Sequence, residues 1–257
     1  MQSIRTISVL GDRTDGNSCM RLQFILCKVM QREAYLCAAR TKNIVDVVLM
    51  PQGLHDEPDK LREEVQKALD NTTDIQGRPY DASLLGYGLC SNGIVGLSAK
   101  IPIVVPRGHD CVTLLLGSKD KYQEYFDSHR GVYWYSAGWI ESGKQPGKER
   151  YEKTLKEYQE KYGDDNAQYL MEMEQGWMKQ YNWATYIDWD FANSNEYRDY
   201  TKRCAEFLNW NYDEIKGEPA LMQKLVDGPW NESEFLVVDP GRKIKENLTD
   251  KGIIKAE

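Results

Sequence analysis

The stretch Leu22-Gln-Phe-Ile-Leu26 is the first of four short apolar segments that decide the fold class. The other three are Val45-Asp-Val-Val-Leu-Met50, Ala82-Ser-Leu-Leu85 and Ile101-Pro-Ile-Val-Val105. Short apolar segments of this kind are typical of strands that are buried on both faces of a sheet. The sequence therefore predicts four strands of one parallel sheet.

Amphipathic segments separate these strands, and we expect helices at residues 28–40, 58–70, 91–99 and 112–128. The second is the clearest, because Pro58 suits a first helical turn and apolar residues then recur on one face. Strands that alternate with helices indicate right-handed crossovers. The N-terminal half is thus predicted to be α/β, a parallel sheet with crossover helices.

The composition of the chain excludes several classes of protein. Its 257 residues, of which 41% are hydrophobic, are enough for a substantial buried core. The 40 Asp and Glu residues outnumber the 33 Lys and Arg residues, which gives a formal net charge of −7. Because binding to nucleic acid or to an anionic membrane depends on clustered positive charge, we expect neither partner.

No targeting or membrane segment is recognisable in the sequence. The N-terminal apolar stretch is short and interrupted, and no later segment approaches the ~20 apolar residues of a transmembrane helix. We therefore expect a cytoplasmic protein. In that reducing compartment the six cysteines are buried thiols, metal ligands or reactive thiols rather than disulfides.

The two halves of the chain differ in composition. Residues 1–130 contain all three histidines and five of the six cysteines, whereas 21 of the 28 aromatic residues lie at or after Tyr133. We expect two regions: an α/β metal-site region over residues 1–140, and an aromatic-rich helical region over residues 141–257 that packs on it.

Aromatic residues recur at helical spacing in the second half, which predicts helices near residues 151–162, 170–181 and 195–208. A fifth strand is expected at residues 133–135 and a late strand at 234–238. The aromatic residues serve as core in the ordinary case. An alternative is a cage for a methylated ammonium group, formed by Tyr133, Tyr135, Trp139, Trp183, Tyr186 and Trp189.

Each of the four predicted N-terminal strands ends in residues that bind metals or move protons. The first ends at Cys27, and the loops after the others contain His55, Cys90 and the pair His109 and Cys111. Ligands of open parallel sheets gather at the carboxyl ends of the strands. We therefore expect these five side chains at one edge of the sheet.

The chemistry of these residues favours a metal. Thiolate and imidazole groups hold Zn²⁺ tetrahedrally, and three protein ligands leave one position for a substrate. We predict Cys90, His109 and Cys111 as ligands and Cys27 as a fourth ligand or a gate. His55 is then a general base or an alternative ligand, and Asp110 orients an imidazole.

Two of the loops resemble each other, which raises the hypothesis of an internal repeat. Pro51-Gln-Gly-Leu-His-Asp and Pro106-Arg-Gly-His-Asp both follow a Val-rich strand, and each is preceded by a strand that ends near a cysteine. The unit would be β-Cys-α-β-His-α. Accidental recurrence of a short loop motif is the alternative, as is the ordinary reading of these side chains as buried core residues.

The glycine-rich loop at residues 86–93 allows two interpretations. Its backbone N–H groups, with those of a following helix, could bind an anionic cofactor through Gly86, Gly88, Ser91 and Gly93. Alternatively, the glycines only permit a tight turn that places Cys90. A Cys90 nucleophile activated without metal is a further option.

The strings Pro51-Gln-Gly-Leu-His-Asp-Glu-Pro, Leu85-Gly-Tyr-Gly-Leu-Cys-Ser-Asn-Gly, Pro106-Arg-Gly-His-Asp-Cys-Val and Gly131-Val-Tyr-Trp-Tyr-Ser-Ala-Gly resemble the domain of unknown function 1638 family of anaerobic bacteria and archaea. The resemblance covers about residues 22–240, and the combination of motifs is specific. It implies no established reaction.

A second, local resemblance concerns His109-Asp-Cys111 with a further cysteine. It is similar to the His-x-Cys zinc site of thiol methyltransferases, in which Zn²⁺ keeps an acceptor thiolate nucleophilic. Here Cys90 precedes the pair, whereas the lone cysteine of those enzymes follows it. Those enzymes are larger (β/α)₈ barrels, which this chain does not match.

These observations lead to an expected function. The first hypothesis is a zinc-dependent transferase of anaerobic metabolism that acts on a small one-carbon or thiol substrate, linked to corrinoid methyl transfer. A corrinoid protein or a methyltransferase would be its partner, and homo-oligomers are compatible with the sequence. The alternatives are an iron–sulfur or corrinoid-handling accessory protein and a metal-free Cys90 thiol enzyme.

Overall fold

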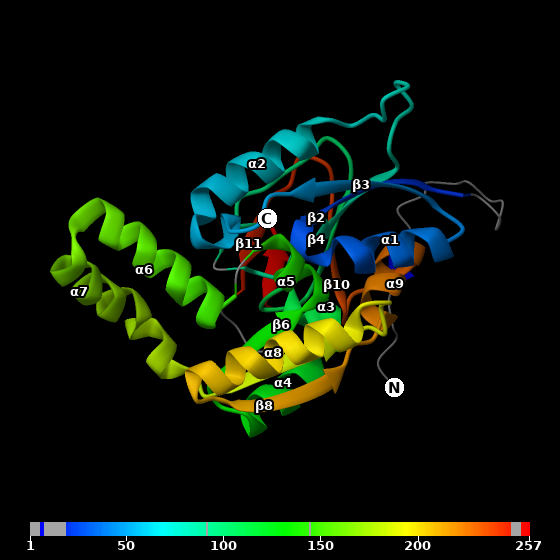
Figure 1. Cartoon of the computed structure of the whole chain (residues 1–257). Helices are drawn as coiled ribbons and strands as arrows, with labels where there is room; N and C mark the ends of the chain where they lie inside the picture. The colour runs from blue at the N-terminus through cyan, green and yellow to red at the C-terminus, as the bar shows by residue number, and fades with distance from the viewer. Residues whose placement is uncertain (1–5, 8–18, 91, 144, 248–252) are drawn as a thin grey trace. The chain divides into compact units, whose positions relative to one another are not determined.

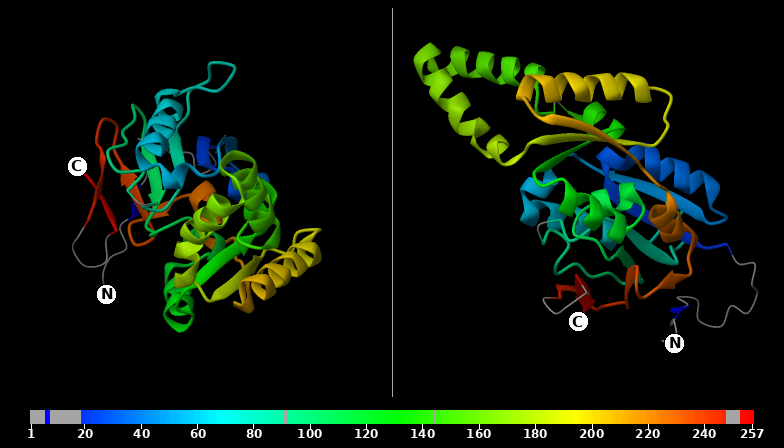
Figure 2. Two further views of the ribbon diagram at one scale, coloured as in Figure 1. Left: turned by 60° about the vertical axis from the view of Figure 1, so that its left-hand side comes forward. Right: turned by 90° about the horizontal axis from the view of Figure 1, so that it is seen from below.

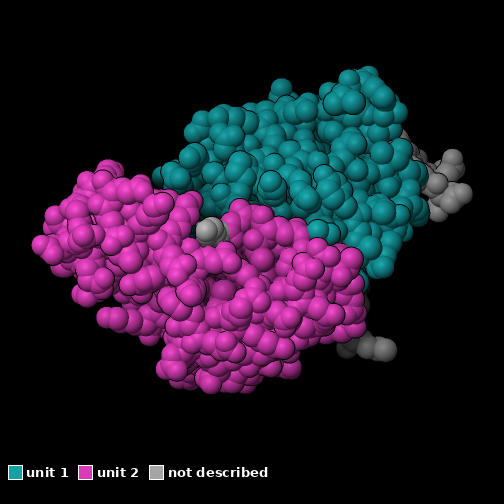
Figure 3. Space-filling view, viewed as in Figure 1, with its two compact units in different colours: residues 1–119, 218–257 teal, residues 120–217 magenta. Residues whose placement is uncertain are grey.

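The computed structural model describes residues 6–7, 19–90, 92–143, 145–247 and 253–257. Contacts divide the chain into two compact units, which Figure 3 shows in different colours. Unit 1 consists of residues 1–119 and 218–257, and unit 2 of residues 120–217. The predicted boundary near residue 140 lies inside unit 2.

A five-stranded sheet with the order β10-β5-β4-β2-β3 forms the centre of unit 1. Its strands are β2 (Arg21–Cys27), β3 (Ile44–Met50), β4 (Ala82–Gly86), β5 (Ile103–Pro106) and β10 (Phe235–Val238). The first four are parallel, and β10 pairs antiparallel with β5. The predicted parallel sheet is confirmed, and the late strand forms one of its edges.

Helices cover both faces of this sheet. They are α1 (Gln31–Arg40), which follows the short 3₁₀ helix η1 (Lys28–Met30), α2 (Pro58–Asp70), α3 (Val112–Leu116) and α9 (Ala220–Asp227). Figure 1 shows α2 on one side of the sheet and α1 with α9 on the other. The predicted apolar face of α2 is buried through Leu61, Val65 and Leu69, so this helix has the expected bounds and orientation.

Two predicted helices of unit 1 differ from the structure. Residues 92–99 form turns and irregular backbone instead of a helix. The helix predicted at residues 112–128 is divided by Gly117, which has a φ of 74°. A Cβ atom at Gly117 would lie 2.6 Å from the carbonyl oxygen of Glu218, so the chain turns where only glycine fits.

Short elements complete unit 1. These are β1 (Thr6–Ile7), which pairs with β9 (Trp230–Asn231), β11 (Ile244–Glu246), which pairs with β12 (Ile254–Ala256), and the 3₁₀ helix η2 (Leu54–Asp56).

A second parallel sheet, with the order β6-β7-β8, forms the centre of unit 2. Its strands are β6 (Val132–Ser136), β7 (Trp183–Asp188) and β8 (Asn211–Lys216). The associated helices are α4 (Lys119–Ser128), α5 (Ala137–Ser142), α6 (Lys148–Tyr162), α7 (Asp164–Glu174), the 3₁₀ helix η3 (Gln175–Gln180) and α8 (Ser194–Leu208). Figure 2 shows α6 and α7 side by side as a hairpin.

The aromatic-rich helical region is confirmed, but strands β7 and β8 were not predicted from the sequence. β7 is almost wholly buried, and its residues Tyr186 and Ala184 pack with Tyr135 of β6 in the core of unit 2. Aromatic residues at positions 183, 186 and 189 are compatible with helical as well as extended spacing, which is why periodicity did not identify the strand.

No helix in the described part of the chain is long and apolar enough to cross a membrane.

Candidate functional site

The sheet of unit 1 has a topological switch point between β2 and β4. The chain leaves β2 toward β3 on one side and leaves β4 toward β5 on the other side. Adjacent parallel strands that diverge in this way leave a crevice at their carboxyl ends, where ligands of such sheets bind. Cys27 is the last residue of β2, and Tyr87 directly follows β4.

The loop after β4 is joined to the loop after β5 by backbone hydrogen bonds. The N–H of Leu89 donates to the carbonyl of Gly108 at 2.9 Å, and the N–H of Cys90 donates to the carbonyl of His109 at 3.0 Å. A Cβ atom at Gly88 would lie 2.6 Å from the backbone nitrogen of Asp110. This close backbone approach holds the Cys90 loop against the loop that contains Cys111.

The three thiols at this edge influence one another electrostatically. Burial raises the pKa of Cys90 to about 12, and the charges of Asp110 and Cys27 contribute further. Burial is also the largest cause that raises the pKa of Cys111 well above its ordinary value. The charges of Cys90, Asp110 and Cys27 raise it further. The structure therefore brings Cys27, Cys90 and Cys111 near one another, and their role as metal ligands stays a prediction.

The backbone at Cys90 is unusual, because this non-glycine residue has a φ of 45°. A positive φ is unfavourable for a side chain with a Cβ atom and is found most often where function requires it. Backbone N–H groups of Gly88 and Cys111 partly offset the rise in the pKa of this thiol. The strained turn therefore presents Cys90 to groups from both loops.

Tyr87 is a residue of this site that sequence reasoning missed. Its side chain is buried, with 4% of the residue exposed, and its hydroxyl has no hydrogen-bond partner among the described residues. After burial, the largest causes of its raised pKa are Cys27, Cys90 and Cys111. The sequence feature that could have indicated Tyr87 is its place between two glycines directly after a buried strand.

The two predicted histidines are exposed. His55 lies on η2, and its Nε2 atom is 3.4 Å from Asp56. The backbone carbonyl of His109 holds the Cys90 loop, but neither imidazole is among the main causes of the thiol pKa shifts. Asp110 accepts the N–H of Val112 at 2.9 Å, so its carboxylate orients the start of α3.

The predicted anion-binding glycines are packed against protein. A Cβ atom at Gly86 would lie 2.6 Å from Cβ of Leu26, and one at Gly93 would lie 2.5 Å from a methyl group of Leu61. Close packing thus accounts for the missing side chains of these glycines, and their role toward a cofactor stays a prediction. Ser91 lies outside the described residues.

Among the described residues, no group of three or more His, Cys, Asp or Glu side chains has an arrangement ready to hold a metal ion. Cys19 is exposed, and Cys37 is fully buried in α1 as expected for core.

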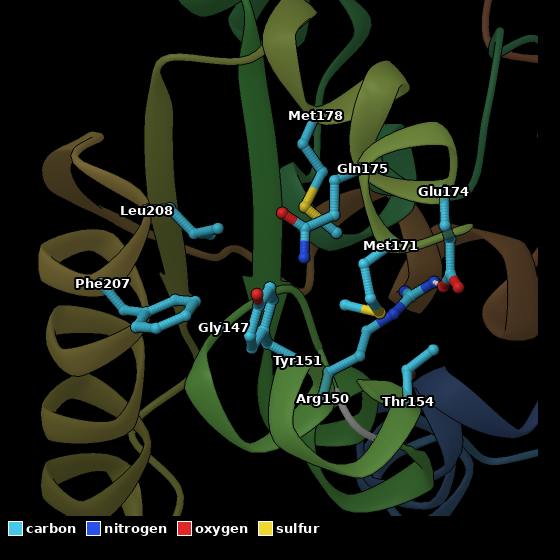
Figure 4. A pocket seen from close by; sticks show the side chains of 10 residues that line it. All are labelled: Gly147, Arg150, Tyr151, Thr154, Met171, Glu174, Gln175, Met178, Phe207 and Leu208. Atoms are coloured by element: carbon cyan, nitrogen blue, oxygen red, sulfur yellow. Dashed lines mark hydrogen bonds and ion pairs between the residues drawn. The ribbon is translucent and has the colours of Figure 1, made fainter. Parts of the chain in front are cut away.

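Unit 2 contains two cavities of different size. The cavity in Figure 4 lies between α6, α7, η3 and α8, but its volume of about 10 Å³ corresponds to a single water. Arg150 crosses it to reach Glu174 at 3.2 Å. A wider depression of about 400 Å³ borders Cys204, Lys148 and Arg203.

The aromatic residues of unit 2 pack on one another. Tyr135 and Tyr186 are fully buried in the core. The rings of Tyr133, Trp177 and Tyr181 have centroids 5.5–6.0 Å apart, which is the spacing of direct ring contact. Rings in contact leave no space for a ligand between them, so these residues serve as packing material.

Comparison with known proteins identifies a family. A family model described as "Protein of unknown function (DUF1638)" matches residues 49–226. Because the match covers more than half of the chain, the chain belongs to this family, as the loop motifs indicated. The comparisons with curated proteins and with solved structures gave no match.

Proposed function

We propose that this member of the family is a zinc-dependent transferase whose ion is held by Cys27, Cys90 and Cys111. The observation that supports the proposal most directly is the backbone pairing of the Cys90 loop with the loop that contains Cys111, beside the end of β2 at Cys27. Three thiolate ligands leave one position of a tetrahedral zinc site for a substrate.

The pKa shifts favour a metal enzyme over a metal-free thiol enzyme. With a pKa of about 12, the Cys90 thiol is protonated at neutral pH, whereas a nucleophilic cysteine must be a thiolate. A bound cation reverses this effect, because it deprotonates the thiols that coordinate it. The burial that disfavours a free thiolate therefore suits a thiolate bound to zinc.

The chemistry of such a site suggests a small thiol or one-carbon substrate. The cysteines would hold the ion, which would lower the pKa of a substrate thiol; the thiolate could then accept a methyl group, with the corrinoid donor leaving with the electron pair of the broken bond. A corrinoid protein or another methyltransferase is the partner that would supply the group. The free thiols agree with a reducing, cytoplasmic setting.

Metal analysis of protein purified without oxygen tests the proposal. The wild type should contain about one zinc ion per chain, and Cys27→Ser, Cys90→Ser and Cys111→Ser should each lose nearly all of it, since serine is a poor ligand for zinc. Cys19→Ser is the matched control, because this exposed cysteine lies outside the cluster. Its zinc content should equal that of the wild type.

Three other results would contradict the proposal. Iron with a brown colour would indicate an iron–sulfur protein with the same cysteines. Activity that depends on Cys90 in a protein without metal would indicate a thiol enzyme. Full zinc content in the Cys90→Ser, Cys111→Ser double variant would exclude the proposed ligands.

A further inference from the structure

We propose that a depression in unit 2 binds a small zwitterion with an apolar side chain, as a free amino acid of the phenylalanine type has. The depression lies between the start of α6 and the C-terminal half of α8, and its volume is about 400 Å³. Small-molecule sites commonly have volumes of about 300–1,000 Å³. The inference concerns unit 2 alone and does not depend on the proposed metal site of unit 1.

The floor of the depression is closely packed. Cys204 of α8 is 5% exposed, and a Cβ atom at Gly147 would lie 2.6 Å from its sulfur. Tyr200 also lines the depression, and its hydroxyl accepts the N–H of Gln145 at 3.4 Å. A ligand would therefore meet a surface that is already ordered, which limits the entropy lost on binding.

The side chains around this floor carry charges of both signs. Lys148 and Arg203 are positive, whereas Glu149 and Glu206 are negative. A ligand with a single charge, whether an anion or a cation, would meet two like charges here. A zwitterion has an opposite charge for each of the two pairs, so it matches the lining in a way that a singly charged ligand does not.

Three of these charges are available to a ligand. Among the described residues, no ion pair involves Glu149, Arg203 or Glu206. Lys153 farther along α6 shows the ordinary arrangement on this helix, with its Nζ atom 3.5 Å from Glu157. The unpaired charges can bind the ammonium and carboxylate groups of a ligand without first breaking an ion pair.

The depression also offers an apolar surface. Phe207 lines it and is 43% exposed, and its ring centroid lies 5.7 Å from that of Tyr151, so the ring is held in place. An apolar ligand side chain that covers the rings of Phe207 and Tyr200 removes apolar surface from water. The zwitterion that fits this lining is therefore one with an apolar side chain.

Titration of the protein with three related probes, followed by NMR, tests the charge requirement. L-Phenylalanine carries both charges, 3-phenylpropanoate lacks the ammonium group, and 2-phenylethylamine lacks the carboxylate. L-Phenylalanine should bind with a Kd of about 1 mM, and the other two about tenfold more weakly, since each loses one favourable pair and keeps two like charges. Equal binding of all three, tighter binding of either singly charged probe, or no binding of L-phenylalanine would overturn the inference.

Two substitutions of exposed residues test which charge binds which group. Arg203→Gln should weaken binding of L-phenylalanine about fivefold without weakening that of 2-phenylethylamine. Glu149→Gln should weaken L-phenylalanine to a similar extent without weakening 3-phenylpropanoate. Lys153→Gln is the matched control, because it removes a charge of α6 outside the depression and should leave all three affinities unchanged. Wild-type affinity for L-phenylalanine in Arg203→Gln or in Glu149→Gln would overturn the assignment.

Discussion

The two units use the carboxyl edge of a parallel sheet in different ways. In unit 1 this edge carries three thiols with raised pKa values and the hydroxyl of Tyr87, which has no hydrogen-bond partner among the described residues. In unit 2 the corresponding edge carries Asp188 at the end of β7, whose carboxylate accepts hydrogen bonds from Ser194 at 2.7 Å and from Arg198. The Asp188 carboxylate is satisfied by donors of unit 2, whereas the Tyr87 hydroxyl has no such partner in the described part of the chain.

This difference separates a binding site from a structural network. Polar groups that satisfy one another stabilise a fold and leave nothing for a ligand to complete. Groups that are buried without partners raise the free energy of the empty protein and are offset only by something that binds. Similar parallel sheets therefore acquire different roles through the hydrogen bonding at their edges.

The largest effect on stability is expected at Asp188. Asp188→Ala should lower the free energy of unfolding by about 3 kcal/mol, because it leaves Arg198 and Ser194 without their buried acceptor. Chemical denaturation measures this loss, and the zinc content should not change. Asp190→Asn, which removes the exposed ion pair with Lys216 and suits the φ of 55° at this position, should leave the midpoint nearly unchanged. Loss of zinc in Asp188→Ala would contradict the assignment of a structural role to the Asp188 network and of metal binding to the thiols alone.

A smaller effect is expected at Gly88. The new Cβ atom of Gly88→Ala would meet the backbone of Asp110 at 2.6–2.8 Å, and backbone atoms cannot move aside as a side chain does. We expect a destabilisation of about 1–3 kcal/mol together with weaker zinc binding. Gly176→Ala in unit 2 is the control, since no atom lies within 4 Å of its added Cβ. Unchanged zinc affinity in Gly88→Ala would show that contact between the two loops is not required.

The smallest effect concerns pH. The Cys90 thiol has a pKa of about 12 in the folded protein and near 9 when unperturbed, so its contribution to stability is present below pH 9 and is lost as pH rises toward 12. Denaturation of the zinc-free protein should show a fall of about 1 kcal/mol by pH 10 from this group. The decline should be shallower in Cys90→Ser and unchanged in the exposed-site variant Cys19→Ser. Equal slopes in all three proteins would argue against a buried Cys90 thiol.

Local sequence patterns predicted much of unit 1 because its elements have a clear period. The apolar strands β2 to β5 and the amphipathic helix α2 were found where periodicity placed them. The helix expected at residues 91–99 was wrong, because Gly93 and Gly96 serve turns and Gly93 packs against Leu61. Strand β6 was predicted at residues 133–135, whereas β7 and β8 were not, because the aromatic residues of β7 also fit helical spacing.

The candidate site was predicted in part. That Cys27, Cys90 and Cys111 are neighbours followed from the rule for strand ends. The exposure of His55 and His109 could not be predicted from that rule. The direction of a side chain in a loop depends on the backbone hydrogen bonds that the loop forms. Tyr87 was identified only by its burial and missing partner, which no sequence pattern shows.

The sequence by itself determined the α/β class, the family and the edge of the sheet where the thiols lie, because strand periodicity and the residues at strand ends are local properties of the chain. Tertiary structure alone decided that the chain connections diverge at a switch point between β2 and β4, that the Cys90 loop pairs with the Cys111 loop, and that the buried Tyr87 hydroxyl has no partner among the described residues. These features arise from contacts between residues distant in the chain, and their energies depend on burial, which only the folded protein establishes.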